Sequence, residues 1–207
     1  MSFRRRPLAH LPARGRPALR AACAAALMLS GCLSGCGDND SGGSSQAGFV
    51  KGDDGFDTVP VAARKPAPAI DGRTTHGDPL NIADYKGKVV VLNIWGSWCG
   101  PCIAEAPGFA EVAEENRSKG VQFVGINTRD SSTAQAISFE ERHELPYPSL
   151  FDPSGKLMLR FPKGSLNPQF LPSTIVVDRH GRTAARAIGP LGEQQLRKMI
   201  QPLTAED

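Results

Sequence analysis

The sequence of 207 residues contains no apolar run of the roughly 20 residues that a membrane-spanning helix requires. The apolar run that follows the basic N-terminus, residues 21–29, is only nine residues long. A permanent spanning helix is therefore not expected. The composition, with 40% hydrophobic and 22% charged residues, is that of a globular protein and differs from that of a membrane bundle or a disordered tail.

Acidic residues are absent from the first 31 positions, which hold six arginines. Without this stretch the formal net charge changes from +3 to −3. The basicity of the whole chain therefore does not support a nucleic-acid partner or attraction by anionic lipid headgroups. A basic segment followed by a short apolar run is typical of a bacterial export signal that is later removed. We expect residues 1–31 to be such a signal peptide.

Two copies of the tetrapeptide Leu-Ser-Gly-Cys follow the apolar run and end at Cys32 and Cys36. The pattern resembles a lipobox, after which a bacterial lipoprotein is cut and its new N-terminal cysteine is acylated. The uninterrupted apolar run favours Cys32. Cleavage before Cys36 is the alternative, because it leaves no spare thiol near an oxidising envelope. Residues 32–66 are expected to form a flexible tether, since much of this segment is too polar and glycine-rich to bury a core. The lipid would anchor the chain to the outer face of the cytoplasmic membrane.

Residues 67–207 have the pattern of one compact domain. The expected strands are 88–95, 121–127, 173–178 and 183–188, and the expected helices are 101–119, 131–145 and 193–203. The first strand is a β-branched apolar run with little alternation, which indicates a central strand covered on both faces. Strand, helix and strand in close succession imply a right-handed parallel crossover, and the last two strands predict an antiparallel hairpin. The fold class is therefore α/β, with a mixed central sheet and helices on both faces.

Two cysteines stand three positions apart in Trp98-Cys99-Gly100-Pro101-Cys102, where the first strand gives way to a helix. The spacing brings both sulfurs onto one helical turn, and the first sulfur faces free N–H groups and the positive end of the helix dipole. Both features favour the thiolate, which is the species that attacks a disulfide. We predict that Cys99 is the nucleophile and Cys102 the resolving thiol. A zinc site is not expected, because there is no second C-x-x-C pair.

The longer string from Val91 through Cys102, continuing to Glu105 and Pro107, resembles the TlpA/ResA-like group of envelope thiol-disulfide reductases. The resemblance extends over roughly residues 66–203 and implies a thioredoxin fold. It also implies reduction of protein disulfides, for example the C-x-x-C-H cysteines of apocytochrome c before haem attachment. The resemblance implies no cofactor other than the redox-active disulfide. It implies a membrane protein similar to CcdA or DsbD as the electron donor.

Members of that group carry a cis-proline that faces the two cysteines just before a strand, and Pro172 in Phe-Leu-Pro-Ser-Thr matches it. A cis proline exposes the preceding backbone, here that of Leu171, for pairing with an extended substrate strand. Trp98, Gly100 and Pro101 are further expected substrate contacts. Trp95 is open between two interpretations, a wall of the site or simple core.

Asn93 departs from thioredoxins proper, which usually have a buried aspartate six residues before the first cysteine as a proton acceptor. An amide cannot accept that proton. Glu105, one helical turn after Cys102, matches a glutamate of ResA-like proteins that helps to set thiol acidity. A buried carboxylate there raises the pKa of a neighbouring thiol and can relay its proton. The alternative is that Glu105 is a solvated helix residue.

The first alternative function is a disulfide oxidant or isomerase, because the Gly-Pro dipeptide of reducing thioredoxins only partly sets the direction of electron flow. A Sco-type copper-delivery protein would need three residues between its cysteines and a histidine ligand, and His143 and His180 lack that context. A peroxiredoxin would need threonine where Gly96 stands. A binding module with an inert disulfide has no need of this motif at a helix start.

Overall fold

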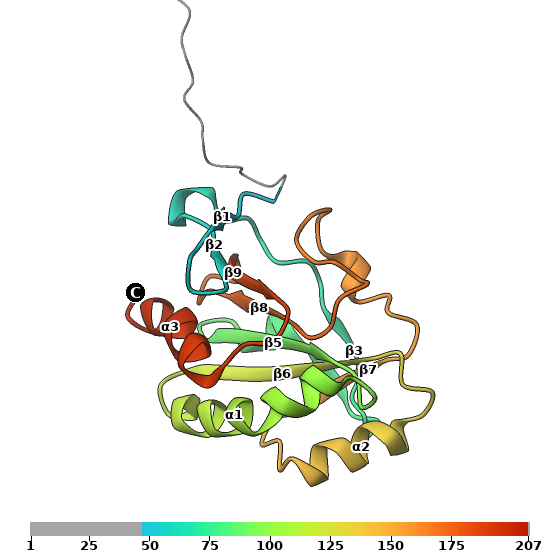
Figure 1. Cartoon of the computed structure of the whole chain (residues 1–207). Coiled ribbons are helices and arrows are strands. Elements are labelled where there is room, and N and C mark those ends of the chain that lie inside the picture. Colours follow the sequence, from blue (N-terminus) through green and yellow to red (C-terminus); the bar gives the residue numbers. More distant parts are fainter. Residues whose placement is uncertain (1–46, 207) are drawn as a thin grey trace, which may run out of the picture. The chain divides into compact units, whose positions relative to one another are not determined.

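The structure, a computed structural model, describes residues 47–206 (Figure 1). The expected signal peptide, the cysteine expected to be acylated and the first part of the expected tether lie outside these residues. Within the described part of the chain, no helix has the length and apolar character needed to cross a membrane.

A seven-stranded mixed sheet forms the centre of the domain, in the order β1-β2-β9-β8-β5-β6-β7. Its strands are β1 (Val50–Lys51), β2 (Asp57–Thr58), β5 (Val89–Trp95), β6 (Val121–Thr128), β7 (Ser149–Asp152), β8 (Ser173–Val177) and β9 (Thr183–Ile188). β6 runs parallel to both β5 and β7, whereas β8 runs antiparallel to both β5 and β9. The sheet is therefore mixed, as the sequence predicts.

Strand β5 lies between β8 and β6, and all seven of its residues are buried. Because side chains alternate along a strand, Val91 packs in the core on one face and Leu92 in the core on the other. A run of β-branched residues without polar alternation suits a strand that is covered on both faces. The chain leaves the carboxyl end of β5 and enters helix α1 within a few residues.

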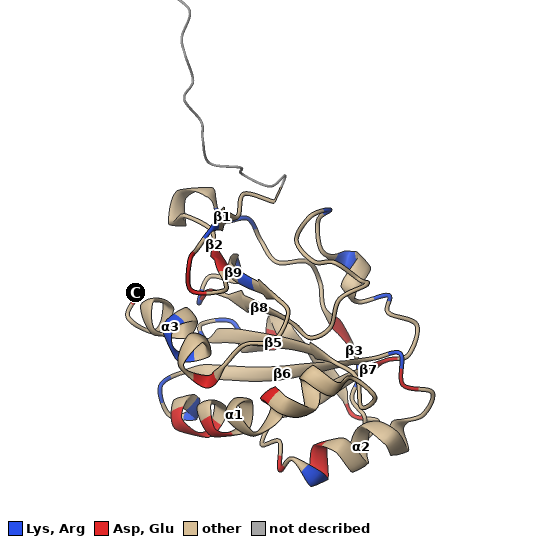
Figure 2. Cartoon of the chain, viewed as in Figure 1, with Lys and Arg blue, Asp and Glu red and all other residues tan. Residues whose placement is uncertain are grey.

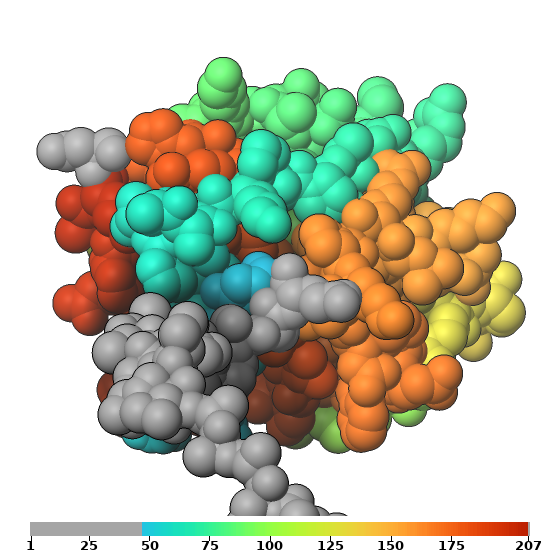
Figure 3. All heavy atoms as spheres, turned by 90° about the horizontal axis from the view of Figure 1, so that it is seen from above, coloured from blue at the N-terminus to red at the C-terminus, as the bar shows by residue number. Residues whose placement is uncertain are grey.

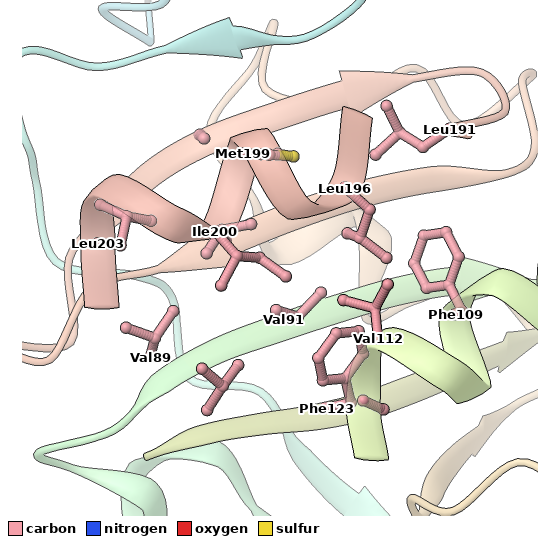
Figure 4. Packing of buried hydrophobic residues seen from close by; sticks show 14 of the residues in the cluster. Val89, Val91, Phe109, Val112, Phe123, Leu191, Leu196, Met199, Ile200 and Leu203 are labelled. Atoms are coloured by element: carbon pink, nitrogen blue, oxygen red, sulfur yellow. The ribbon is translucent and has the colours of Figure 1, made fainter. Parts of the chain in front are cut away.

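The three α-helices lie on the same face of the sheet. They are α1 (Gly100–Arg117), α2 (Thr133–Arg142) and α3 (Glu193–Thr204). Phe109 of α1 and Leu196 of α3 pack in one core cluster with Val91 of β5 (Figure 4). Phe139 of α2 stacks on Trp95, with ring centroids 4.3 Å apart. Trp95 points to the same face as Val91, because the two are four residues apart on one strand.

The opposite face is covered by shorter elements. They are the hairpin of β3 (Asp71–Arg73) and β4 (Pro79–Asn81), with the 3-10 helices η2 (Ile82–Tyr85) and η3 (Met158–Arg160). We expected helices on both faces, and only these short 3-10 helices occupy the second one. The connection from β7 to β8 holds four prolines between residues 153 and 172, which prevent a long helix there.

All of the expected strands and helices form, with ends that differ by three residues at most. Helix α2 ends at Arg142 rather than at Leu145. The physical reason is that Glu144 adopts a left-handed conformation, with φ 49°, and Pro146 follows two residues later. Strand β7 was not predicted.

The expected tether is wrong for residues 47–66, which belong to the folded domain. Strand β2 pairs with strand β9, the 3-10 helix η1 (Val61–Ala63) follows, and Phe49 and Val59 are only 2% and 3% exposed. Phe49 shares a core cluster with Met158, so the early chain (blue to turquoise) lies beside the segment near residue 158 (orange) in Figure 3. The polar composition around Asp53 and Asp54 concealed this, because the apolar partners come from distant segments.

Candidate functional site

Cys99 and Cys102 lie at the carboxyl end of β5, where helix α1 begins. Cys99 is the N-cap residue of α1 in an extended conformation, and Pro101 stands in the first turn, where its missing N–H costs no helical hydrogen bond. The two sulfurs form a disulfide with an S–S distance of 2.08 Å, and the Cα atoms are 5.2 Å apart. The structure therefore holds the oxidised state of the predicted pair.

The position of Cys99 favours a thiolate in the reduced state. Its sulfur accepts a hydrogen bond from the backbone N–H of Cys102, at 3.3 Å, and the first turn of α1 contains no acidic residue. The helix dipole and the free N–H groups of this turn therefore act on the sulfur without a competing carboxylate. Such an environment favours the thiolate form of a cysteine, which is the form that attacks a disulfide, and so suits the role predicted for Cys99.

The disulfide packs against buried aromatic side chains on its inner side and has an exposed tryptophan beside it. Cys99 and Cys102 share a buried cluster with Trp95 and Phe139, and Trp95 itself is 1% exposed. Trp95 is therefore core beneath the disulfide rather than an exposed wall. Trp98 lies on the outside, 53% exposed, where a substrate can contact it.

Glu105 is buried one helical turn after Cys102, with 7% of its surface exposed. This excludes the alternative of a solvated helix residue. Its carboxylate accepts hydrogen bonds from Nδ2 of Asn93 at 2.9 Å and from the backbone N–H of Leu191 at 3.1 Å. Residues three apart on a helix lie on one face, so Glu105 and Cys102 share the inner side of α1.

Burial raises the pKa of Glu105 to about 7, because a carboxylate loses its hydration there, and the hydrogen bonds from Asn93 and Leu191 oppose that rise. A group with this pKa is present in both protonation states near neutral pH. Glu105 can therefore accept a proton in one step of a reaction and return it in another.

Pro172 lies directly before β8, and the preceding Leu171 packs against the buried cluster that contains Cys99 and Cys102. The Leu171–Pro172 peptide bond is cis, as predicted. Among the described residues, no hydrogen bond engages the backbone N–H or C=O of Leu171. An extended polypeptide can therefore pair with Leu171 as an added strand does.

A groove of about 300 Å³ runs beside the disulfide. It is lined by Trp98, Cys99, Gly100, Pro101, Arg129, Gln169, Phe170 and Leu171. Four of the five residues predicted to contact substrate line this groove, and the fifth, Pro172, is buried and is not part of the lining. The exposed Phe170 was missed, although it belongs to the segment quoted for the cis-proline.

Sequence reasoning also missed the turn after β6. Asp130, 1% exposed, accepts hydrogen bonds from the backbone N–H of Ser97 at 3.1 Å and from its hydroxyl at 2.8 Å. It also accepts one from Nδ2 of Asn127 at 2.5 Å. Asp130 therefore fixes the loop that carries Trp98 and Cys99. The sequence could have indicated this residue. The carboxyl ends of parallel strands meet at one edge of a sheet, and polar residues follow β6 at that edge.

No group of three or more His, Cys, Asp or Glu side chains that could hold a metal ion occurs among residues 47–206. His180 lies in an exposed turn at the end of β8, and His143 packs on the ring of Phe139. Neither histidine lines the groove beside the disulfide.

The chain is similar to known proteins over most of the folded domain. A family model described as Redoxin matches residues 62–200. The thiol:disulfide interchange protein HelX of Rhodobacter capsulatus is 34% identical over 151 residues, which cover 71% of this chain and 80% of that protein. The thiol-disulfide oxidoreductase ResA of Bacillus cereus is 29% identical over 140 residues, covering 68% and 78%. A crystal structure of a DsbF homologue from Corynebacterium diphtheriae superposes with a TM-score of 0.67 at 36% identity, covering 72% of this chain and 93% of that one.

Proposed function

Because the chain belongs to the Redoxin family, as a thiol-disulfide oxidoreductase of the TlpA/ResA-like group with a thioredoxin fold, we propose that it is a lipid-anchored reductase of protein disulfides outside the cytoplasm. Its proposed substrates include the C-x-x-C-H cysteines of apocytochrome c. Its proposed electron donor is a membrane protein similar to CcdA or DsbD, which returns the Cys99–Cys102 disulfide to the dithiol.

The reaction transfers two electrons from the cysteine pair to a substrate disulfide. The Cys99 thiolate attacks one substrate sulfur, a mixed disulfide forms, and the other substrate sulfur leaves as a thiolate and is protonated. Cys102 then loses its proton and attacks the sulfur of Cys99, which breaks the mixed disulfide and releases the second substrate thiol. The protein ends with the Cys99–Cys102 disulfide that the structure holds.

The observation that carries this proposal is the burial of Glu105 on the same helix face as Cys102. The resolving step needs a base, because Cys102 is 1% exposed and bulk water cannot readily take its proton. Glu105, with a pKa raised to about 7, can take that proton and pass it to the leaving substrate thiolate. The groove and the free backbone of Leu171 supply the place where an extended substrate segment lies.

The direction of electron flow is inferred from the dipeptide between the cysteines. Gly100-Pro101 is the dipeptide of reducing thioredoxins, for which the reduction potential is on the order of −270 mV. Such a couple donates electrons to disulfides of higher potential, such as strained or exposed ones, whereas a strong oxidant has a potential of about −120 mV.

Membrane anchoring rests on the sequence before the domain. If Cys32 is acylated, 16 residues separate it from Phe49, the first large side chain buried in the domain. The connection is shorter than the 32–66 segment expected from composition. The reductase would then work close to the membrane surface, where an integral membrane donor can reach it.

The direct test is a redox equilibrium titration of the oxidised protein against glutathione buffers, followed by mass spectrometry of alkylated cysteines. We expect one two-electron couple at Cys99 and Cys102 with a midpoint near −270 mV. A midpoint near −120 mV would show an oxidant, and the absence of any titrating couple would exclude the enzymatic function.

A further inference from the structure

The turn between β6 and α2 places a cation beside the disulfide. Arg129 follows the last residue of β6 and adopts a left-handed backbone conformation, with φ 62°, between Thr128 and Asp130, which are 0% and 1% exposed. A positive φ is uncommon outside glycine, asparagine and aspartate. The two buried neighbours fix the turn, and the Arg129 side chain is the exposed one of the three.

The Arg129 guanidinium lies over the ring of Trp98, 5.1 Å from its centroid. Stacking on an aromatic face orients a guanidinium and leaves the N–H groups at its edge free to bind a carboxylate. Within residues 47–206, no ion pair or side-chain hydrogen bond occupies these groups. Arg129 therefore presents a fixed and unpaired positive charge at the rim of the site.

The groove beside the disulfide has one charged residue in its lining, and that residue is Arg129. The other lining residues are apolar or neutral, and Trp98 and Phe170 are 53% and 59% exposed. The exposed acidic residues of α1, Glu111, Glu114 and Glu115, gather near the C-terminal end of the helix, away from Cys99 (Figure 2). A substrate segment in the groove meets an apolar platform and one cation, with no acidic side chain in the lining.

We propose that Arg129 is a specificity residue that selects protein segments in which an acidic side chain lies next to the disulfide. The apolar part of the segment contacts Trp98 and Phe170, its backbone pairs with Leu171, and its carboxylate accepts hydrogen bonds from the Arg129 guanidinium. This inference rests on the proposed reductase function and adds to it the chemistry of the substrate. The covalent steps are unchanged, because Arg129 binds the substrate and takes no part in electron transfer.

The test uses three synthetic peptides, each with one intramolecular disulfide, that carry Glu, Gln or Lys on both sides of the cysteines and are otherwise identical. The rate constant for reduction of each peptide by the pre-reduced protein is measured at low ionic strength. The wild-type protein is expected to reduce the Glu peptide about two- to fivefold faster than the Gln peptide, which is the range for an exposed ion pair. The Lys peptide is expected to be slowest.

Substitution separates the proposed contact from a general effect of charge. Arg129→Gln is expected to bring the Glu-to-Gln rate ratio close to one, and Arg129→Lys to retain part of the preference. The matched control is Arg117→Gln, which removes one positive charge at the other end of the 18-residue helix α1, roughly 27 Å of helix away, and is expected to keep the wild-type ratio. Because only ratios are compared, an effect of Arg129 on the acidity of Cys99 cancels.

Each outcome has a distinct meaning. A ratio that is the same in the wild type and in Arg129→Gln overturns the inference and leaves the reductase function intact. A wild-type protein that reduces none of the peptides overturns the proposed function, and the inference with it. The preference should also weaken in 1 M salt, where charges are screened within about 3 Å; a preference unaffected by salt contradicts an ionic contact.

Discussion

Nδ2 of Asn93 donates a 2.9 Å hydrogen bond to Oε1 of Glu105. Asn93 occupies the strand position where thioredoxins proper usually have an aspartate, and Glu105 stands on the helix that carries Cys102. The buried carboxylate is thus supplied by α1, and the strand supplies a donor to it. A donor stabilises the charged form, so Asn93 limits the rise in the pKa of Glu105 that burial causes.

Glu105 is expected to make the oxidised protein less stable as the pH rises through neutral values. Its pKa in the folded protein is about 7, above the ordinary value of 4.5, so folding favours the protonated carboxyl. The stability contributed by that proton is fully present below pH 4.5 and is lost as pH rises through 7. Glu105→Gln, which cannot ionise, should gain up to about 3 kcal/mol in unfolding free energy relative to the wild type between pH 4.5 and pH 8. Urea unfolding of both oxidised proteins at several pH values measures this; parallel pH profiles would contradict the assignment.

Substitution of the two cysteines should have different effects on the reduction of a peptide disulfide. Cys99→Ser removes the attacking thiolate and should abolish reduction of a peptide disulfide. Cys102→Ser leaves the first step possible and removes the second, so a mixed disulfide between Cys99 and the peptide should accumulate. Mass spectrometry of non-reduced samples distinguishes the two. Accumulation in Cys99→Ser rather than in Cys102→Ser would reverse the assigned roles.

Asp130 is expected to position the active-site loop. Asp130→Ala removes the acceptor of three hydrogen bonds and leaves the Ser97 N–H without its partner, which should lower the unfolding free energy by about 1–3 kcal/mol. It should also slow the attack of Cys99, because Ser97 lies two residues before it. Asp130→Asn keeps one acceptor oxygen and should recover part of the rate. The readout is the rate of peptide-disulfide reduction at a temperature where each variant is fully folded; wild-type rates in Asp130→Ala would leave Asp130 with a structural role only.

Phe49 should contribute to stability although it lies in the segment expected to be a tether. Its side chain is 2% exposed and the Arg186 guanidinium lies 4.2 Å from its ring centroid. Phe49→Ala should therefore cost about 3 kcal/mol, the low end for a buried phenylalanine. The neighbouring Val50 is 49% exposed, and Val50→Ala should change stability by less than about 0.5 kcal/mol. Equal midpoints for the two variants in urea would show that residues near 49 do not belong to the folded unit.

The lipid anchor should depend on one of two cysteines. Cys32→Ser is expected to move the protein from the membrane fraction to the soluble fraction, whereas Cys36→Ser should leave it in the membrane. Mass spectrometry of the N-terminal peptide then identifies the acylated residue. The opposite pattern would place cleavage before Cys36, and membrane association of both single variants and their double variant would exclude acylation at this site.

Local sequence was sufficient for most of the fold. Two local patterns are sufficient here. The β-branched run before Trp95 predicts a strand, and the cap and proline at the start of α1 predict the beginning of a helix. Strand β7 and strands β1 and β2 were missed or misassigned because they are two to four residues long. Strands this short form only when a neighbouring strand is already in place, as β9 is for β2.

The sequence by itself determined the chemistry of this protein: two cysteines on one helical turn, with a glutamate one turn further on, require only the local geometry of a helix. The tertiary structure decided what surrounds them. It buries Glu105, whose carboxylate accepts a hydrogen bond from the Leu191 N–H. It also brings the Ser97 N–H to the carboxylate of Asp130 and places the Arg129 guanidinium over the ring of Trp98. Each of these contacts joins segments that are distant along the chain, and burial by distant segments determines the acidity of a carboxyl and the orientation of a loop. A pattern of neighbouring residues contains no record of that burial.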